Sequence, residues 1–323
     1  MTTAAPPGPL LLADTPADWV ATHLAAFQAA HDEPGPVAGY RWTSVDELLA
    51  DGAAPLRREH RRLTAAGTTP AAAAKWLVSW YAGGIAEAVG FAYATGAAAL
   101  LPDPAGLRFR VHPDGWPDRA DPAAREVAVA AGHAWAGQPG VRVVADDAAL
   151  AALAVGALTA AVDPIVRACR TLAKVGTTAL WTEVGDGFGL PVLHRPALPV
   201  AEEVVRRLQE AVRTPRRPWR QVPDLRAARV PAGWAYLGRK AGCCLSYQCP
   251  DEPAPDPAEV DERTRAHDER FPPETPRYCS TCSLRDLAGC EQRQEFWLEQ
   301  ERACRPSFHV VSLTSPTSGE GAA

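Results

Sequence analysis

Apolar side chains recur at helical spacing over much of the chain, and clusters of proline and glycine separate these stretches. The strongest stretch covers residues 70–95, where Trp76, Trp80, Tyr81 and Phe91 supply the bulk. We expect Trp76, Trp80 and Tyr81 to pack in the core, with an aromatic wall of a ligand site as the alternative. Another helix is predicted to follow Ser44, because Glu47 stands three residues later, as in a capping box. Weaker helical patterns cover 18–31, 202–213, 258–270 and 290–304, and residues 147–173 are predicted to form one long helix or two, interrupted near 163–164.

Strand patterns are shorter and fewer. Residues 107–112 alternate apolar and basic side chains, and residues 141–144 are rich in β-branched ones. The glycines within 185–189 predict a turn, since their spacing does not match a dinucleotide-binding loop. The prolines within 216–234 predict an irregular linker. Together these patterns predict an α+β fold that is mostly helical.

Composition divides the chain into four parts. Residues 1–35, rich in proline and alanine, are expected to be partly disordered, and residues 36–235 to form the main α+β domain. Residues 236–310 hold most of the cysteines and an acidic, proline-rich insert, 251–277, which we expect to be a solvated loop with a short helix. Residues 311–323, rich in Ser, Thr and Gly, are predicted to be a disordered tail.

Charge and apolar content limit the classes of partner. The net charge is −5, with no basic stripe or tail, so we expect no nucleic-acid partner. The apolar runs are shorter than the ~20 residues of a membrane-spanning helix, and no basic residue precedes the N-terminal leucines. We therefore expect no membrane span and a cytoplasmic location. Only three of the 33 basic residues are lysines, which we attribute to coding background rather than to a ligand.

Seven of the eight cysteines lie in the last quarter of the chain, which indicates metal or redox chemistry rather than disulfides in a cytosolic protein of this size. Cys169 lies in an apolar helix and is expected to be a buried small hydrophobe. Cys290 and Cys304 are expected to pack on the last helix rather than to bind a metal. The remaining five are Cys243, Cys244, Cys249, Cys279 and Cys282.

The spacing of four of these cysteines narrows the chemistry. Cys279 and Cys282 form a Cys-x-x-Cys turn, in which both thiolates point at one metal centre. Cys243 and Cys244 are adjacent, and neighbouring side chains of an extended segment point to opposite sides, which suits one tetrahedral zinc poorly. A binuclear cluster relaxes this constraint, and Gly242 gives the backbone freedom just before the pair. Iron–sulfur is favoured on this geometry, and zinc stays open.

Both cysteine segments resemble the C-terminal signature of the FhuF family of ferric siderophore reductases. The segments are Gly242-Cys-Cys-Leu-Ser-Tyr-Gln and Tyr278-Cys-Ser-Thr-Cys-Ser-Leu-Arg, with weaker likeness around Trp76-Leu-Val-Ser-Trp-Tyr, residues 100–115 and Leu180-Trp-Thr-Glu. The resemblance implies a [2Fe–2S] cluster held by Cys243, Cys244, Cys279 and Cys282. The chain departs from the family in the 34 residues between Cys244 and Cys279, where the family's gap is short, and in Cys249, an alternative ligand.

The resemblance further implies an oxidoreductase that passes electrons from an unidentified cellular donor to Fe(III) in a siderophore, of the hydroxamate type. We expect the siderophore in a cleft between the main domain and the cysteine segment. Positive charge near the ligands raises a cluster's potential, and four basic residues flank them: Arg239, Lys240, Arg277 and Arg285. Two other interpretations remain: a structural zinc module of a binding protein, and an iron or redox sensor.

Overall fold

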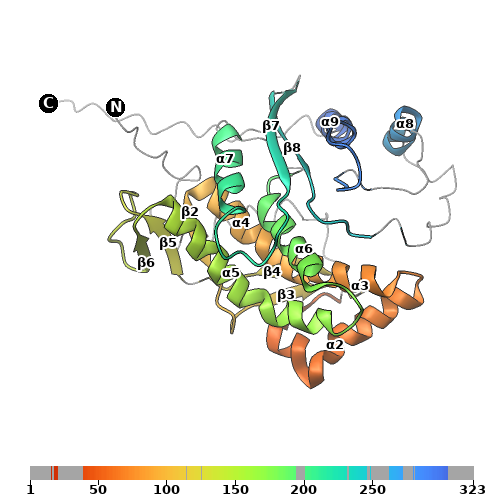
Figure 1. Ribbon diagram of the computed structural model, residues 1–323, viewed down its shortest axis with the longest axis horizontal. Coiled ribbons are helices and arrows are strands. Elements are labelled where there is room, and N and C mark those ends of the chain that lie inside the picture. Colours follow the sequence, from red (N-terminus) through yellow and green to blue (C-terminus); the bar gives the residue numbers. More distant parts are fainter. Residues whose placement is uncertain are drawn as a thin grey trace.

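The computed structural model describes residues 16, 18–20, 39–113, 115–124, 126–193, 201–230, 233–245, 248, 262–271, 279 and 281–304. This part of the chain is a mixed α+β structure with several small sheets, and at 54% helix it is mostly helical, as the sequence predicts (Figure 1). The predicted tail at 311–323 and nearly all of the predicted loose segment at 1–35 lie outside the described residues.

The elements follow one another in a mixed order of helices and short strands. They are β1 (Arg41–Ser44), α2 (Val45–Ala65), α3 (Pro70–Leu77), the π-helix η1 (Val78–Gly83), α4 (Gly84–Gly96), β2 (Ala98–Leu101), β3 (Arg108–Val111), β4 (Pro117–Asp121), β5 (Glu126–Ala130), β6 (Val141–Val144), α5 (Asp147–Arg170), α6 (Thr177–Gly189), α7 (Ala201–Ala211), β7 (Asp224–Val230), β8 (Gly233–Arg239), α8 (Glu262–Arg270) and α9 (Leu287–Cys304).

Helix α2 begins with the predicted capping box. The Ser44 hydroxyl accepts the Glu47 N–H at 3.1 Å, and the Glu47 carboxylate accepts the Ser44 N–H at 2.7 Å. The helix is kinked over residues 50–53, where three successive residues have positive φ. After the kink its second part runs to Ala65 and contacts α3, since His60 Nε2 lies 3.0 Å from the Pro70 carbonyl oxygen.

The predicted helix at 70–95 is confirmed as the successive elements α3, η1 and α4. Thr69 caps its start, with Pro70 in the first turn, where a missing N–H costs nothing. Tyr81 is buried as expected, whereas Trp76 and Trp80 are only partly buried at the edge of the main core. The two tryptophans therefore lie where the core meets other segments.

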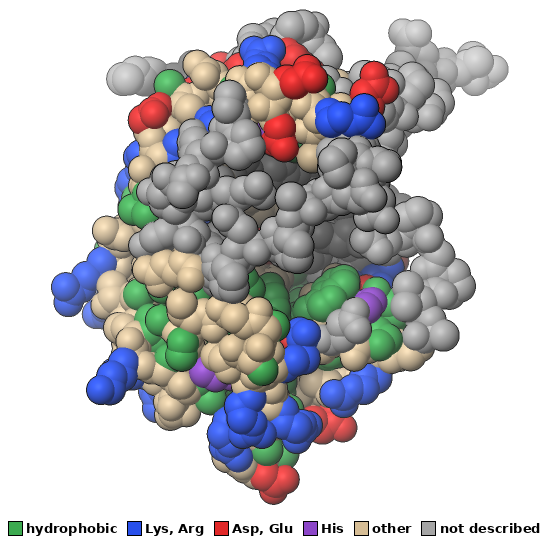
Figure 2. Space-filling view, turned by 90° about the vertical axis from the view of Figure 1, so that its right-hand side faces the viewer, with side chains coloured by type: hydrophobic (Ala, Val, Ile, Leu, Met, Phe, Trp, Pro, Cys, Tyr) green, Lys and Arg blue, Asp and Glu red, His purple; other side chains and the backbone are tan. Residues whose placement is uncertain are grey.

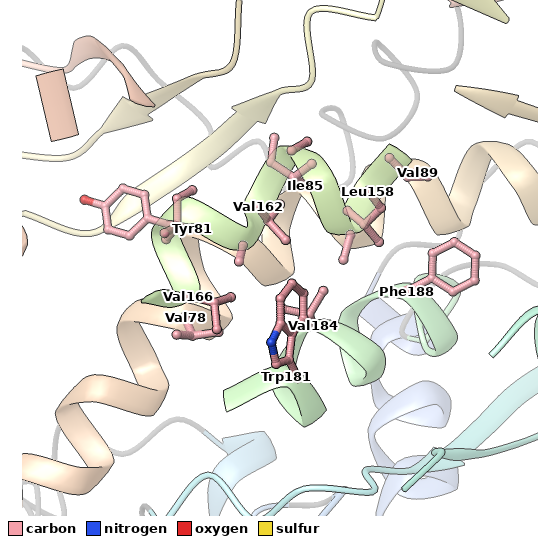
Figure 3. Close-up of a cluster of buried hydrophobic side chains, with 14 of the residues drawn as sticks. Val78, Tyr81, Ile85, Val89, Leu158, Val162, Val166, Trp181, Val184 and Phe188 are labelled. Carbon is pink, nitrogen blue, oxygen red and sulfur yellow. The ribbon is translucent and has the colours of Figure 1, made fainter. Parts of the chain in front are cut away.

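The main core lies between α4, η1, α5 and α6, whose apolar side chains meet in Figure 3. Of the two possibilities for residues 147–173, the single long helix is confirmed as α5, and the chain is not interrupted near 163–164 although Pro164 lies within the helix. Among the described residues α5 is the one helix with the length and composition of a membrane span, but half of its apolar window is buried inside the protein. A core helix has the same properties, so α5 alone does not indicate a membrane.

The turn predicted at 185–189 is wrong, because these residues form the last part of α6. Their glycines allow close packing instead. A Cβ on Gly185 would lie 2.8 Å from the Trp219 ring, and one on Gly187 would lie 2.7 Å from the Gly83 carbonyl oxygen. A Cβ on Gly189 would lie 2.5 Å from Pro223. The glycines therefore let neighbouring segments approach the helix.

Two small sheets flank the helices. Strands β1, β3 and β4 form one antiparallel sheet, while β2, β5 and β6 form another in which β6 runs parallel to β5. The strands predicted at 107–112 and 141–144 are confirmed as β3 and β6.

The linker predicted at 216–234 is wrong for its second half, because β7 and β8 form an antiparallel hairpin there. The prolines do not interrupt β7, since Pro223 directly precedes the strand, a position that strands tolerate, and the next proline in the sequence comes after its last residue. The hairpin contacts α7 on one side and α9 on the other (Figure 1).

Part of the acidic insert packs on the protein rather than being looped out into solvent. Its helix α8, predicted at 258–270 and found at Glu262–Arg270, leads to Phe271. His267 stacks on Trp297 of α9 at 4.9 Å between ring centroids, and Phe271 meets Phe296 edge-on at 5.9 Å. The remainder of 251–277 lies outside the described residues.

Candidate metal centre

The end of strand β8 brings the two cysteine segments together despite the 34 residues between them. The Lys240 N–H donates to the Thr281 carbonyl at 2.9 Å, inside the Cys-x-x-Cys turn. The Arg239 guanidinium donates to the Arg285 carbonyl at 3.3 Å, just after that turn. Three residues after Lys240 the chain reaches Cys243, so the strand delivers the cysteine pair to the turn.

The turn that carries Cys279 and Cys282 has the local hydrogen bonds of a metal-binding knuckle. The Cys282 N–H donates to the Cys279 carbonyl at 3.1 Å, and the Arg285 N–H to the Cys282 carbonyl at 3.1 Å. The Leu284 N–H points at Cys282 Sγ at 3.4 Å. Backbone N–H groups that donate to sulfur stabilise a thiolate and tune the potential of an iron–sulfur cluster.

The adjacent pair shows the same backbone-to-sulfur contact. The Leu245 N–H donates to Cys243 Sγ at 3.4 Å, and Leu245 has a left-handed φ of 63°. A non-glycine residue with that conformation is uncommon and is held there by its surroundings. One such contact is the Trp76 indole N–H, which donates to the Cys244 carbonyl at 3.1 Å.

Helix α6 holds the segment that precedes the pair. The Asp186 carboxylate accepts the Ala241 N–H at 2.7 Å and the Gly242 N–H at 3.0 Å. Gly242 allows this approach, because a Cβ there would lie 2.9 Å from Thr182 Cγ2. Gly242 was expected to supply backbone freedom. In the structure its role is steric, because the absence of a side chain lets the segment lie against α6.

Two of the three lysines lie at this site, with two acids. Lys75 and Glu183 form a buried ion pair of 2.8 Å, with side chains 4% and 1% exposed, and Lys75 also donates to the Ala179 carbonyl at 3.1 Å. Burial acts to lower the pKa of Lys240, but Glu183, Asp186 and the thiols of Cys279 and Cys244 outweigh it and raise that pKa. Lys240 is therefore a cation held beside the sulfur atoms.

Burial and neighbouring acids also act on Asp186. Its removal from water, together with the charge of Glu183, raises the pKa of Asp186 to about 7, against the lowering effect of its two backbone hydrogen bonds and of Lys240. Asp186 and Glu183 stand three residues apart on α6 and so share one face of the helix.

The thiols of Cys279 and Cys243 favour their protonated forms as long as no metal is bound. A hydrogen bond with Cys244, then burial, raises the pKa of Cys279, and burial raises that of Cys243 despite the N–H of Leu245. Thiols that act as nucleophiles or in dithiol exchange have lowered pKa values, so this environment does not favour such roles. A metal binds thiolates and displaces these protons.

Helix α9 hydrogen-bonds both to strand β8 and to the Cys-x-x-Cys turn. The Gln294 amide, buried in the protein, donates to the Gly238 carbonyl at 2.6 Å and accepts the Gly238 N–H at 2.9 Å, which ties α9 to β8. The Cys290 thiol donates to the Cys282 carbonyl at 3.4 Å, and burial raises the pKa of Cys290 to about 11. Cys290 is thus a buried packing residue, as predicted, and its thiol hydrogen-bonds to the backbone of the turn.

The structure brings together the four cysteines that the sequence singles out, within the limits of what it describes. Cys279 contacts Cys244, and the charges of Cys282 and Cys244 contribute to the raised pKa of Cys243. No three His, Cys, Asp or Glu side chains among the described residues stand in a ready metal-binding arrangement. Cys249, the alternative ligand, lies outside the described residues, as does the side chain of Cys304.

The donor set nevertheless fits a [2Fe–2S] cluster by its chemistry, because it offers four thiols. Backbone N–H groups point at the sulfur atoms of Cys243 and Cys282, and the Lys240 cation interacts with Cys279 and Cys244. Cys169 is fully buried, as predicted, and burial raises its pKa to about 12. The sequence analysis did not assign a supporting role to five residues, namely Lys75, Trp76, Glu183, Asp186 and Gln294. Trp76 and Glu183 lie in the segments that show the weaker family likeness, and the scarcity of lysine was a signal for Lys75.

No protein-family model matches this chain, and neither a curated protein nor a solved structure matches it.

Proposed function

We propose that this protein holds a [2Fe–2S] cluster through Cys243, Cys244, Cys279 and Cys282 and acts in the cytoplasm as a ferric siderophore reductase. The observation that carries the proposal is the meeting of the cysteine pair with the Cys-x-x-Cys turn, through the contact of Cys244 with Cys279. The nature of the substrate, Fe(III) in a hydroxamate-type siderophore, rests on the resemblance of both cysteine segments to the FhuF family.

The surroundings of the thiols support electron transfer rather than acid–base catalysis. When bound, such a cluster supplies one electron at a time at a potential that charge and hydrogen bonds set. Lys240 places positive charge at the sulfur atoms, and the N–H groups of Leu245 and Leu284 donate to two of them. The rest of the protein holds this shape: Trp76 and Asp186 fix the segment of the pair, and Gln294 fixes the strand that leads to it.

The substrate chemistry is consistent with this design. Siderophore oxygens are hard ligands that bind Fe(III) strongly, so reduction to Fe(II) weakens the complex and releases the metal. Outer-sphere transfer of an electron needs proximity and a suitable potential, and no nucleophile or general base. The electron donor remains to be identified.

The test is anaerobic purification followed by visible absorption and EPR of the reduced protein, repeated for serine variants at the five cysteines 243, 244, 249, 279 and 282. We expect the spectrum of a [2Fe–2S] protein, lost in each variant except Cys249→Ser, and reduction of a ferric hydroxamate siderophore by the reduced wild type. Loss in Cys249→Ser with retention in Cys243→Ser would overturn the ligand set. A colourless protein that binds one equivalent of zinc would mean that the site holds zinc rather than a cluster. A cluster that is reduced and reoxidised but does not reduce the siderophore would indicate a sensor.

A further inference from the structure

The second part of α2 carries a basic face that the sequence analysis overlooked when it found no basic stripe. Four of the eight residues from Leu56 to Leu63 are arginines, against one glutamate. Three of these arginines, Arg58, Arg61 and Arg62, are exposed, and Arg57 is half-buried. Residues three and four apart share a helix face, so the four guanidinium groups lie on one side of the helix.

The charges of this face are only partly neutralised. Arg62 pairs with Glu59 at 2.6 Å, and Arg57 donates to the carbonyls of Asp51 and Gly52, which leaves its positive charge without a carboxylate. Arg58 and Arg61 make no ion pair with any residue that the structure describes. The face therefore keeps a net positive charge on a chain whose total charge is −5.

The helix that carries the basic face packs against the helix that contacts the cysteine pair. His60, within this stretch, contacts the Pro70 carbonyl at the start of α3, and Trp76 near the end of α3 donates to the Cys244 carbonyl. Six residues of helix separate Pro70 from Trp76, which is about 9 Å at 1.5 Å per residue. Helix α2 and the segment of the cysteine pair thus contact the two ends of one short helix, while the arginines lie on the exposed side of α2, away from the buried His60. Figure 2 shows Lys and Arg side chains gathered low on the side of the molecule where α2 and α3 lie in Figure 1.

We propose that the basic face of α2, formed by Arg57, Arg58, Arg61 and Arg62, is the docking surface for an acidic one-electron carrier protein. This proposal rests on the function proposed above, since it names the kind of partner that would supply the electrons. Complementary charge steers partners together and sets their orientation, and its effect on the association rate is strongest at low salt. An electron carrier must place its redox centre near the acceptor, and α2 is separated from the segment of the cysteine pair by one packed helix, α3.

The test measures binding, so it does not depend on turnover. The probe is oxidised plant-type [2Fe–2S] ferredoxin, a small acidic electron carrier, titrated calorimetrically into the anaerobically purified protein at about 0.01 M and about 0.15 M salt, where the Debye length is about 30 Å and about 8 Å. We expect Arg58→Glu/Arg61→Glu to weaken binding at least about tenfold at the lower salt, with a smaller loss at the higher. Arg61→Glu is compared with Arg142→Glu, an exposed arginine on β6 at the other end of the molecule, which should bind like wild type.

Three results would overturn the proposal. They are no binding of ferredoxin by the wild type at low salt, equal loss in Arg61→Glu and Arg142→Glu, and tighter binding of a single-stranded oligonucleotide that is lost with the same substitutions. The last would mean that the face serves nucleic acid. The proposed function is tested separately, by the absorption spectrum of the protein and by its reaction with ferric siderophore. The two tests are independent, because oxidised ferredoxin can bind whether or not the protein reduces the siderophore. Circular dichroism of each variant excludes unfolding.

Discussion

The buried ion pair of Lys75 and Glu183 predicts a large and strongly non-additive effect on stability. Lys75→Met leaves Glu183 ionised at 1% exposure with Lys240 as the remaining cation nearby, and it removes the hydrogen bond to the Ala179 carbonyl. Removing one member of a buried pair costs about 3–5 kcal/mol. We expect Lys75→Met and Glu183→Met each to lower the free energy of unfolding by about that amount.

The double variant Lys75→Met/Glu183→Met should recover much of this loss, because replacing both charges by apolar side chains of similar size is often nearly neutral. The lost bond to Ala179 leaves a residual cost of about 1 kcal/mol, so the coupling energy of the cycle should be about 5 kcal/mol or more. The assay is urea unfolding of the cluster-free protein, followed by circular dichroism, with Lys174→Met as an exposed-lysine control that should change stability by less than about 0.5 kcal/mol. Additive single variants, or a loss below about 1 kcal/mol in Lys75→Met, would refute the reasoning.

Three further predictions concern the support of the cysteine pair. Lys240→Met should shift the midpoint potential of the cluster to more negative values in an EPR-monitored titration, and Lys240→Arg should not, because only the former removes the positive charge beside Cys279 and Cys244. Gly242→Ala should reduce iron loading, since its Cβ would lie 2.9 Å from Thr182 Cγ2, and Thr182→Ser in the same protein should restore part of it by removing that methyl group. Because burial raises the pKa of Asp186 to about 7, stability should fall as the pH rises from about 4 to about 7, by about 4 kcal/mol in total, and Asp186→Asn should flatten the profile of urea unfolding against pH.

Local signals in the sequence were sufficient where the local interaction decides the structure. The capping box at Ser44 forms because both of its hydrogen bonds lie within four residues. The strand at 141–144 and the burial of Cys169 follow equally from apolar and β-branched side chains. These features depend little on what the rest of the chain does.

The roles of glycines and prolines were predicted wrongly where contacts with distant segments decide the local structure. The glycines of residues 185–189 indicate a turn when considered alone, but in the fold they face Trp219, Gly83 and Pro223, and the helix continues. Likewise, the prolines within 216–234 delimit β7 rather than abolish it. No local rule distinguishes a glycine that breaks a helix from one that lets another segment approach it.

The cysteines of the candidate site could be chosen from their spacing, but the groups that position them could not. Asp186 and Trp76 stand 55 or more residues from the segment that they hold, and the weak family likeness around Trp76 did not indicate what it contacts. The scarcity of lysine was attributed to a compositional bias, and although Lys240 was recognised beside the ligands, Lys75 was not. A residue type that is rare in the chain and also buried beside candidate ligands is a stronger signal than its count alone.

The geometry of the cysteine pair therefore derives from the helical core rather than from its own segment. Trp76 belongs to α3, which continues through η1 into α4, and Asp186 belongs to α6, which packs against η1 and α4 through its glycines. The Lys75–Glu183 pair links the same two helices one residue before Trp76 and three before Asp186. Because both hydrogen-bonding groups are anchored in one helix packing, the segment around Cys243 and Cys244 has little freedom of its own. The argument that adjacent cysteines point to opposite sides thus holds only for an isolated extended segment, and the left-handed Leu245 shows that this segment departs from that geometry.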